Sequence, residues 1–177
     1  IKKIPKCTDL CDTYWWKDGV TLTDVRANLH WITSSDDLNL LQKYGVRPLH
    51  WAARYATPDI IQFLLDAGAD PTIKDDLGWT PLHYLTDSSP LSLEEQLANA
   101  ELLLDNGADL TAQNNREATP FDLMEKNSQI TVGSPLYNVF NPNYASCIKN
   151  HYLCTKDVLC SLATEMKNGK TVWGTGQ

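Results

Sequence analysis

The sequence has no apolar run long enough to cross a membrane. A membrane-spanning helix needs about 18 or more largely apolar residues, and no stretch of the 177 residues approaches this length. Several enzyme motifs are also missing, among them the nucleophile elbow, the phosphate-binding glycine loop and the HExxH helix. The apolar share, 42%, is ordinary for a folded protein. We therefore predict a folded chain that does not span a membrane and has no catalytic centre.

Basic side chains are scarce in the middle of the chain. Residues 18–127 contain 18 acidic and 7 basic side chains, a net charge of −11, whereas residues 1–17 and 128–177 each carry +2. An acidic surface repels phosphate, so we expect no nucleic-acid partner. Two interpretations of the acidic middle remain open: a solvated surface that keeps the chain in solution, or a surface that attracts a basic protein.

The middle of the chain also lacks cysteine. The five cysteines lie in the flanks: Cys7, Cys11, Cys147, Cys154 and Cys160. The chain begins at Ile1 rather than Met, which a leader removed on export would explain, as would a trimmed start. We expect a periplasmic or secreted protein with disulfides among these cysteines, and a cytoplasmic location as the alternative. The sequence does not give their connectivity.

One C-terminal segment could bring metal-ligating side chains together. Cys147, His151 and Cys154 are spaced by four and three residues, so they would share one face if the segment is helical. The spacing matches no established zinc pattern. We therefore predict no metal and no cofactor, and keep a metal-binding or thiol-redox protein as the alternative function.

Two short patterns recur in the middle of the chain at matching intervals. The first appears as Arg47-Pro48-Leu49-His50, as Thr80-Pro81-Leu82-His83 and, after a somewhat longer interval, as Thr119-Pro120-Phe121-Asp122. The second appears as Gly68-Ala69-Asp70 and Gly107-Ala108-Asp109, with the same longer interval between its copies. Each Gly-Ala-Asp therefore stands at one constant offset before the next Thr-Pro. Two markers that shift together indicate a repeat with a six-residue insertion.

The residue types at these positions suit two helices in each unit. The Thr80 hydroxyl can cap a helix N-terminus, and Pro81 can occupy the first helical position. Gly68 can end a second, apolar helix. Asp75–Gly78 supplies turn residues for a projecting hairpin.

These motifs resemble the ankyrin repeat, and RPLHWAARYATPDIIQFLLDAGADPTIKDDLGWTPLHYL is nearly a full unit. The resemblance covers about residues 15–140. Upstream, WWKDGVTLTDVRANL looks like the capping helix of short bacterial ankyrin proteins, and ATPFDLMEKNSQITVGSPLYNVF looks like a closing half-repeat. The resemblance implies an all-α solenoid of helix-turn-helix units with hairpin loops. About two full repeats would lie between the caps, flanked by segments 1–14 and 141–177.

Some positions depart from the family pattern. Arg47 replaces the usual Thr, and Asp122 replaces the usual His. Glu117 stands where the turn glycine is expected, although Asn114 and Asn115 can take left-handed conformations nearby.

The resemblance also implies roles for the histidines. His50 and His83 are expected inside the stack, tying a helix to the neighbouring loop through both ring nitrogens. His30 lies on the capping segment without a partner at ligand spacing. Asp75-Asp76 and Asp36-Asp37 are paired carboxylates that we expect to be solvated at turn tips.

An ankyrin stack has a concave face built from the first helix of each unit and the hairpin tips. The geometry of the family implies that this face holds the partner-binding residues Trp51, Arg54, Tyr55, Asp75, Asp76, Leu77, Trp79, Tyr84 and Asp87. Trp, Tyr and Arg are the types that dominate binding energy at protein interfaces. Alternatively, Trp51 and Trp79 pack on adjacent units. The inserted loop, Ser88–Leu93, either carries specificity or is a tolerated surface loop, and a helix is expected to start at Ser92. We predict a non-catalytic accessory or scaffold subunit that binds one protein partner.

Overall fold

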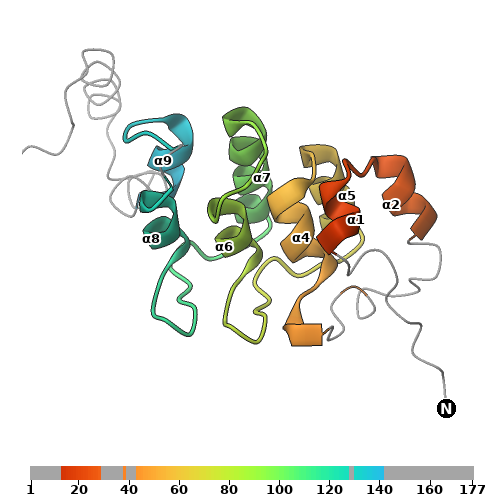
Figure 1. Ribbon diagram of the computed structural model, residues 1–177, viewed down its shortest axis with the longest axis horizontal. Helices are drawn as coiled ribbons and strands as arrows, with labels where there is room; N and C mark the ends of the chain where they lie inside the picture. The colour runs from red at the N-terminus through yellow and green to blue at the C-terminus, as the bar shows by residue number, and fades with distance from the viewer. Residues whose placement is uncertain (1–12, 29–37, 39–42, 128–129, 142–177) are drawn as a thin grey trace, which may run out of the picture.

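The computed structural model describes residues 13–28, 38, 43–127 and 130–141, and within them all regular structure is helical (Figure 1). The elements are α1 (Thr13–Lys17), α2 (Leu22–Asn28), the 3-10 helix η3 (Lys43–Gly45), α4 (Pro48–Tyr55), α5 (Pro58–Asp66), α6 (Pro81–Thr86), α7 (Leu93–Asp105), α8 (Pro120–Glu125) and α9 (Pro135–Phe140). None of the helices in these ranges combines the length and the apolar character needed to cross a bilayer.

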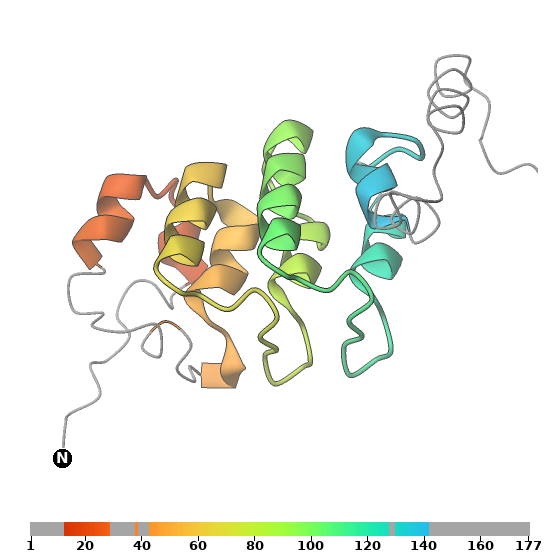
Figure 2. The same cartoon turned by 180° about the vertical axis from the view of Figure 1, so that it is seen from behind.

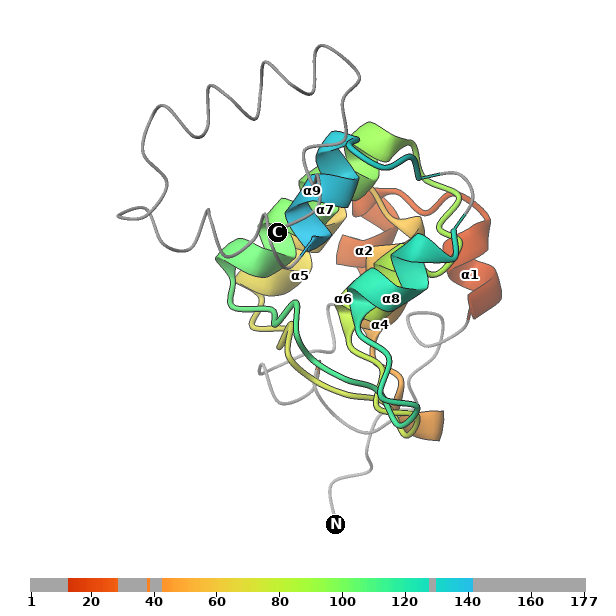
Figure 3. The same cartoon turned by 90° about the vertical axis from the view of Figure 1, so that its left-hand side faces the viewer.

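The helices form two layers, which the end-on view of Figure 3 separates. The inner layer consists of α4, α6 and α8 packed side by side, and the outer layer of α5, α7 and α9. At the N-terminal end α1 packs on α4, and α2 packs on α5. Each helix pair buries its apolar side against the next pair, which is the all-α solenoid expected from the resemblance.

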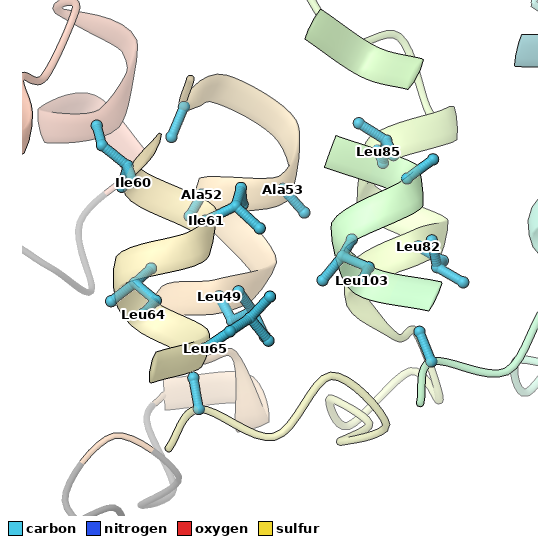
Figure 4. Packing of buried hydrophobic residues seen from close by; sticks show 14 of the residues in the cluster. Leu49, Ala52, Ala53, Ile60, Ile61, Leu64, Leu65, Leu82, Leu85 and Leu103 are labelled. Carbon is cyan, nitrogen blue, oxygen red and sulfur yellow. The ribbon is translucent and has the colours of Figure 1, made fainter. Parts of the chain in front are cut away.

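The core lies between the two layers and continues from one helix pair to the next (Figure 4). Its fully buried side chains in the central pairs are small or aliphatic: Leu49, Ala52, Ala53, Ile60, Ile61, Leu64, Leu82, Leu85 and Leu103. Alanines on α4 let the neighbouring helices approach, and the larger aliphatic side chains fill the space between the layers.

Glycines end the outer helices α5 and α7, as the sequence predicts. Gly68 has a φ of +92° and Gly107 a φ of +97°, a left-handed conformation that glycine adopts without a Cβ penalty. Beyond Gly68, the amide of Ala69 donates to the Leu64 carbonyl at 3.0 Å. Such bonds satisfy carbonyls that a helix end otherwise leaves open.

The hairpins project from the same side of the stack and pack on one another (Figures 1 and 2). The amide of Asp76 donates to the Tyr44 carbonyl at 3.0 Å, and the amide of Asn115 donates to the Leu77 carbonyl at 2.9 Å. A Cβ on Gly78 would lie 2.9 Å from the Asn115 amide nitrogen, and the φ of Gly78 is +77°. Packing and backbone conformation therefore both require glycine at this turn.

Glu117 occupies the turn position that Gly45 and Gly78 hold in the preceding hairpins. Its φ is +60°, whereas Asn114 and Asn115 have no positive φ. The left-handed residue of this turn is therefore Glu117 itself, and neither of the asparagines that could have supplied it. No further hairpin follows this turn within the described ranges, so the Glu117 side chain meets no later hairpin there. Its left-handed backbone still costs about 1 kcal/mol.

Asp75 holds its hairpin together from inside. Its Oδ1 accepts the amides of Leu77 at 2.9 Å and Trp79 at 2.8 Å, and its Oδ2 accepts the Tyr84 hydroxyl at 2.9 Å. The prediction of a solvated pair is wrong for Asp75, which is buried, because these bonds replace its hydration. Asp76 is exposed, as predicted.

Both ends of the described stack are helix pairs. The predicted N-terminal capping helix is divided into α1 and α2, because Gly19, with a φ of +79°, interrupts it. Thr21 then starts α2 through reciprocal bonds: its amide donates to the Asp24 carboxylate at 3.0 Å, and its hydroxyl oxygen accepts the Asp24 amide at 3.3 Å. The predicted closing half-repeat likewise contains two helices, α8 and α9.

Candidate protein-binding face

The predicted partner-binding residues lie at three different depths. Five are half-buried: Trp51, Arg54, Tyr55, Trp79 and Asp87. Two are exposed: Asp76 and Leu77. Two are buried: Asp75 and Tyr84. We use the name inner face for the accessible side chains of α1, α4 and the end of α6: Tyr14, Lys17, Trp51, Arg54, Tyr55 and Asp87.

Three side chains of α4 form one continuous patch. Trp51, Arg54 and Tyr55 follow the spacing that places residues on one side of a helix. The Trp51 and Tyr55 rings stack with centroids 6.3 Å apart, and the Arg54 guanidinium carbon lies 5.5 Å from the centre of the Tyr55 ring. Arg54 also donates to the Asp87 carboxylate at 3.1 Å. The patch therefore joins α4 to the end of α6.

Two donor atoms in this patch have no acceptor within the described part of the chain. They are the indole nitrogen Nε1 of Trp51 and the Nε of Arg54, both buried. Buried donors are almost always paired in folded proteins, and an unpaired one costs about 1–3 kcal/mol. An apolar side chain at either position would avoid this cost, so stability alone does not explain Trp51 and Arg54.

Tyr14 and Lys17 extend the inner face onto α1. The Lys17 Nζ lies 5.7 Å from the centre of the Tyr14 ring and 5.9 Å from the centre of the Tyr55 ring. Tyr14 is 75% exposed. Sequence reasoning missed both residues because their segment was assigned to the cap. The available signal is the three-residue spacing of Tyr14 and Lys17, which places two such side chains together on a helix.

Tyr84 lies beneath the inner face, at the centre of an aromatic cluster. Its ring makes edge-to-face contacts with His50, Trp51 and Trp79, at centroid distances of 5.0, 5.2 and 5.7 Å. Burial, together with the charge of Asp75 and the bond to it, raises the pKa of Tyr84. At 8% exposure the ring is too buried for the predicted partner contact. Trp51 packs on it from the preceding unit, as the alternative interpretation expects, whereas Trp79 packs on it within the same unit.

His50 and His83 tie each inner helix to the next hairpin, as predicted. The His50 Nδ1 accepts the Arg47 amide at 3.1 Å, so Nε2 carries the proton and donates to the Trp79 carbonyl at 3.1 Å. His83 repeats this arrangement with the Ala118 carbonyl at 3.0 Å. Burial lowers the pKa of His50 to about 4 and also lowers the pKa of His83. Both rings are therefore neutral structural donors at neutral pH.

Asp122, which replaces the repeat's histidine, caps its own helix. Its Oδ2 accepts the amide and the hydroxyl of Thr119, each at 2.7 Å, and these bonds lower the pKa of Asp122. No hairpin follows α8 in the described residues, so a histidine would find no later hairpin carbonyl there. The substitution suits the end of the stack.

The insertion between α6 and α7 supports the C-terminal end of α4. The buried Ser89 donates its hydroxyl to the Arg54 carbonyl at 2.7 Å. Asn99 on α7 donates its amide to the Ala56 carbonyl at 2.9 Å. Both bonds satisfy carbonyls that the end of α4 leaves open. Ser92 caps α7, as the sequence predicts.

Acidic side chains gather on the outer layer. The helices α5 and α7 have six carboxylates and no basic side chain: Asp59, Asp66, Glu94, Glu95, Glu101 and Asp105. The inner face has two cations, Lys17 and Arg54, and one carboxylate, Asp87. Six of the 18 carboxylates of residues 18–127 thus lie on these two outer helices.

Several predictions from the sequence concern residues outside the described ranges. They involve His30, His151, the pair Asp36-Asp37 and all five cysteines: Cys7, Cys11, Cys147, Cys154 and Cys160. The disulfides, the metal or thiol-redox alternative and nearly all of the flanks 1–14 and 141–177 therefore stay predictions.

Comparison with known families decides the classification of the chain. The family model for ankyrin repeats, in three copies, matches residues 24–114, which is 91 of the 177 residues. This chain is an ankyrin-repeat protein. Ankyrin arrays are protein–protein interaction modules that use the concave side of the stack, and the inner face lies on the inner layer of this array.

Several known proteins are similar to part of this ankyrin-repeat chain. It is 32% identical over 81 residues to palmitoyltransferase AKR1 of Lachancea kluyveri, covering 38% of this chain and 11% of that protein. It is 51% identical over 43 residues to the neurogenic locus Notch protein of Drosophila melanogaster, covering 24% of this chain and 2% of that protein. It is 47% identical over 45 residues to the neurogenic locus notch homolog protein 1 of Homo sapiens, covering 25% of this chain and 2% of that protein. The chain spans at most 11% of these relatives' lengths, and its resemblance to bacterial ankyrin proteins stays a prediction.

Proposed function

We propose that this protein is a non-catalytic accessory or scaffold subunit that binds one protein partner through its inner face. The stacked Trp51–Tyr55 pair beside Arg54 carries the proposal. These are the residue types that contribute most to affinity at protein interfaces. Here they share one side of α4, remain half-exposed and include buried donors without acceptors among the described residues.

The support beneath the patch also favours recognition. The Tyr84 ring fixes the Trp51 ring from below, and the Arg54–Asp87 ion pair links successive units. A surface whose side chains are already ordered loses less conformational entropy when a partner binds. The inner face is therefore suited to a defined partner rather than to adaptable, nonspecific contacts.

Quantitative capture of partners from the native source tests the proposal. The double variant Trp51→Ala, Tyr55→Ala should weaken capture of a stoichiometric partner about tenfold or more. Phe63→Ala is the matched control, because it truncates a half-buried aromatic residue of the outer helix α5. Tyr84→Ala is unsuitable because it would remove the centre of the buried cluster. Thermal unfolding should first show that each variant is folded. Undiminished capture by the double variant would place the binding site elsewhere.

Export to the periplasm or to the outside of the cell is a further part of the proposal. It is supported by the five cysteines of the flanks. Free thiols should be counted in protein purified from its source without reductant. Four oxidised cysteines support export, and five free thiols without metal support the cytoplasmic alternative. Stoichiometric metal in elemental analysis would favour the metal or thiol-redox function.

A further inference from the structure

We infer that the inner face binds an acidic segment of its protein partner, and that Lys17 is the cation that receives its carboxylate. The inference rests on the proposed function and adds the chemistry of the partner. It starts from the surroundings of Lys17, which differ from those of the cations that stabilise the stack.

Lys17 is held by aromatic rings rather than by oxygen atoms. Its Nζ lies within 6 Å of the Tyr14 and Tyr55 ring centres, at 5.7 and 5.9 Å, where the ring faces attract a cation. No carboxylate of the described residues forms an ion pair with it. The rings thus attract an ammonium group whose charge no carboxylate of the described residues neutralises.

Three other cations of the described stack have oxygen partners, whereas Arg26 on the outer side lies over the Phe63 ring at 5.2 Å. Arg54 pairs with Asp87 at 3.1 Å. Lys74 donates to the Gln113 carbonyl at 2.8 Å. The buried Arg47 donates to the Lys74 carbonyl, also at 2.8 Å. These bonds join successive units, whereas Lys17 forms no such bond with the described part of the chain.

The surface next to Lys17 indicates what else the segment should contain. The Tyr55 ring that contacts Lys17 also stacks on Trp51. A segment whose carboxylate reaches Lys17 therefore brings its neighbouring side chain over the Trp51–Tyr55 pair. A large apolar side chain there would bury aromatic surface that is now half-exposed. The expected feature of the partner is an acidic residue close to a large apolar one.

The distribution of charge favours an acidic segment over a basic one. A basic segment on the inner face would meet the charge of Lys17, since Arg54 is paired with Asp87, and like charges in an interface suppress binding. The acidic outer layer, with six carboxylates on α5 and α7, repels an acidic segment from that side. Complementarity therefore directs such a segment to the inner face.

Matched peptide pools test the inference with the full chain. Each pool of short synthetic peptides has a fixed Leu next to Glu, Gln or Lys and random residues elsewhere, and binding is measured by fluorescence anisotropy. The wild-type protein should bind the Glu pool about fivefold more tightly than the Gln pool, as expected for one ion pair. Lys17→Glu should shift the preference to the Lys pool. Arg26→Glu is the control with the same charge reversal, since Arg26 is exposed on α2 beside Phe63, and it should leave the preference unchanged.

The outcomes separate this inference from the proposed function. Equal binding of the Glu and Gln pools, a preference for the Lys pool, or no binding of any pool by the wild-type protein would overturn it. If Trp51→Ala weakens binding but Lys17→Glu does not change the preference among the pools, the inner face remains the binding site. The inference that it binds an acidic segment is then wrong. If neither variant affects a peptide that binds, both the inference and the proposed function fail.

Discussion

The Nε2–H group of His50 donates to the carbonyl oxygen of Trp79, 3.1 Å away and 29 residues later in the chain. The other ring nitrogen accepts the Arg47 amide. One neutral imidazole thus fixes the start of α4 and the end of the next hairpin. A proton on Nδ1 would point at the N–H group of Arg47, which now donates to that nitrogen. The contact between these units therefore depends on the charge state of His50.

Stability should fall as the pH drops below about 6.5. Burial lowers the pKa of His50 from 6.5 to about 4. Between these values unfolded His50 binds a proton that folded His50 does not, so His50 alone should lower the free energy of unfolding by about 1.4 kcal/mol per pH unit. Above pH 6.5 this contribution is complete. Urea unfolding across the window tests the slope. His50→Gln should be less stable at neutral pH and show a shallower slope; equal slopes would contradict the assignment.

Gly78→Ala should destabilise the stack by about 2 kcal/mol or more. The new Cβ would lie 2.9 Å from the Asn115 amide nitrogen, on a backbone with a φ of +77°. Gly133→Ala is a useful control, because Gly133 also has a positive φ but a Cβ there meets nothing within 4 Å. Chemical unfolding should show a clearly larger loss for Gly78→Ala. Equal losses would mean that the hairpin contact adds nothing beyond backbone strain.

Glu117→Gly should stabilise the protein by about 0.5–1 kcal/mol. The substitution relieves a left-handed backbone, with a φ of +60°, at an exposed turn. Thermal unfolding should show a raised melting temperature, whereas Glu117→Ala should show no comparable gain. A loss of stability in the glycine variant would indicate that the Glu117 side chain makes a contact of its own.

Tyr84→Phe should lower the free energy of unfolding by about 1–3 kcal/mol and leave partner capture almost unchanged. The variant keeps the ring contacts but removes the hydroxyl that donates to Asp75 at 2.9 Å. Because Tyr84 is only 8% exposed, it should affect binding only through Trp51 above it. Capture should be compared with that of Trp51→Ala at a temperature where both are folded. Strong loss of capture by folded Tyr84→Phe would contradict this and show that the hydroxyl and its bond to Asp75 are needed for binding.

The sequence predicted the features that depend on local chemistry and spacing. Gly68 and Gly107 end their helices, Ser92 starts α7, and His50 and His83 bridge the units. Each of these follows from a short pattern and the repeat that carries it. The helix layers follow in turn, because stacked repeats place the same helix of each unit beside that of its neighbour.

Burial of individual polar and aromatic side chains was not predictable in the same way. Asp75 and Tyr84 are nine residues apart, and they meet only because the hairpin returns to α6. Lys17 and Tyr55 belong to different units, so their contact depends on how α1 packs on α4. These features are set by tertiary neighbours, and a pattern along one segment carries no information about them.

The turn at Glu117 determines how the array could be lengthened by duplication. An extra unit placed among the earlier ones would keep a glycine opposite each incoming backbone, as Gly45 and Gly78 now are. A unit appended after α8 would instead bring an amide nitrogen to the place where Glu117 has its Cβ. Adding a repeat after α8 therefore requires glycine at position 117, whereas duplicating an earlier unit requires no such substitution.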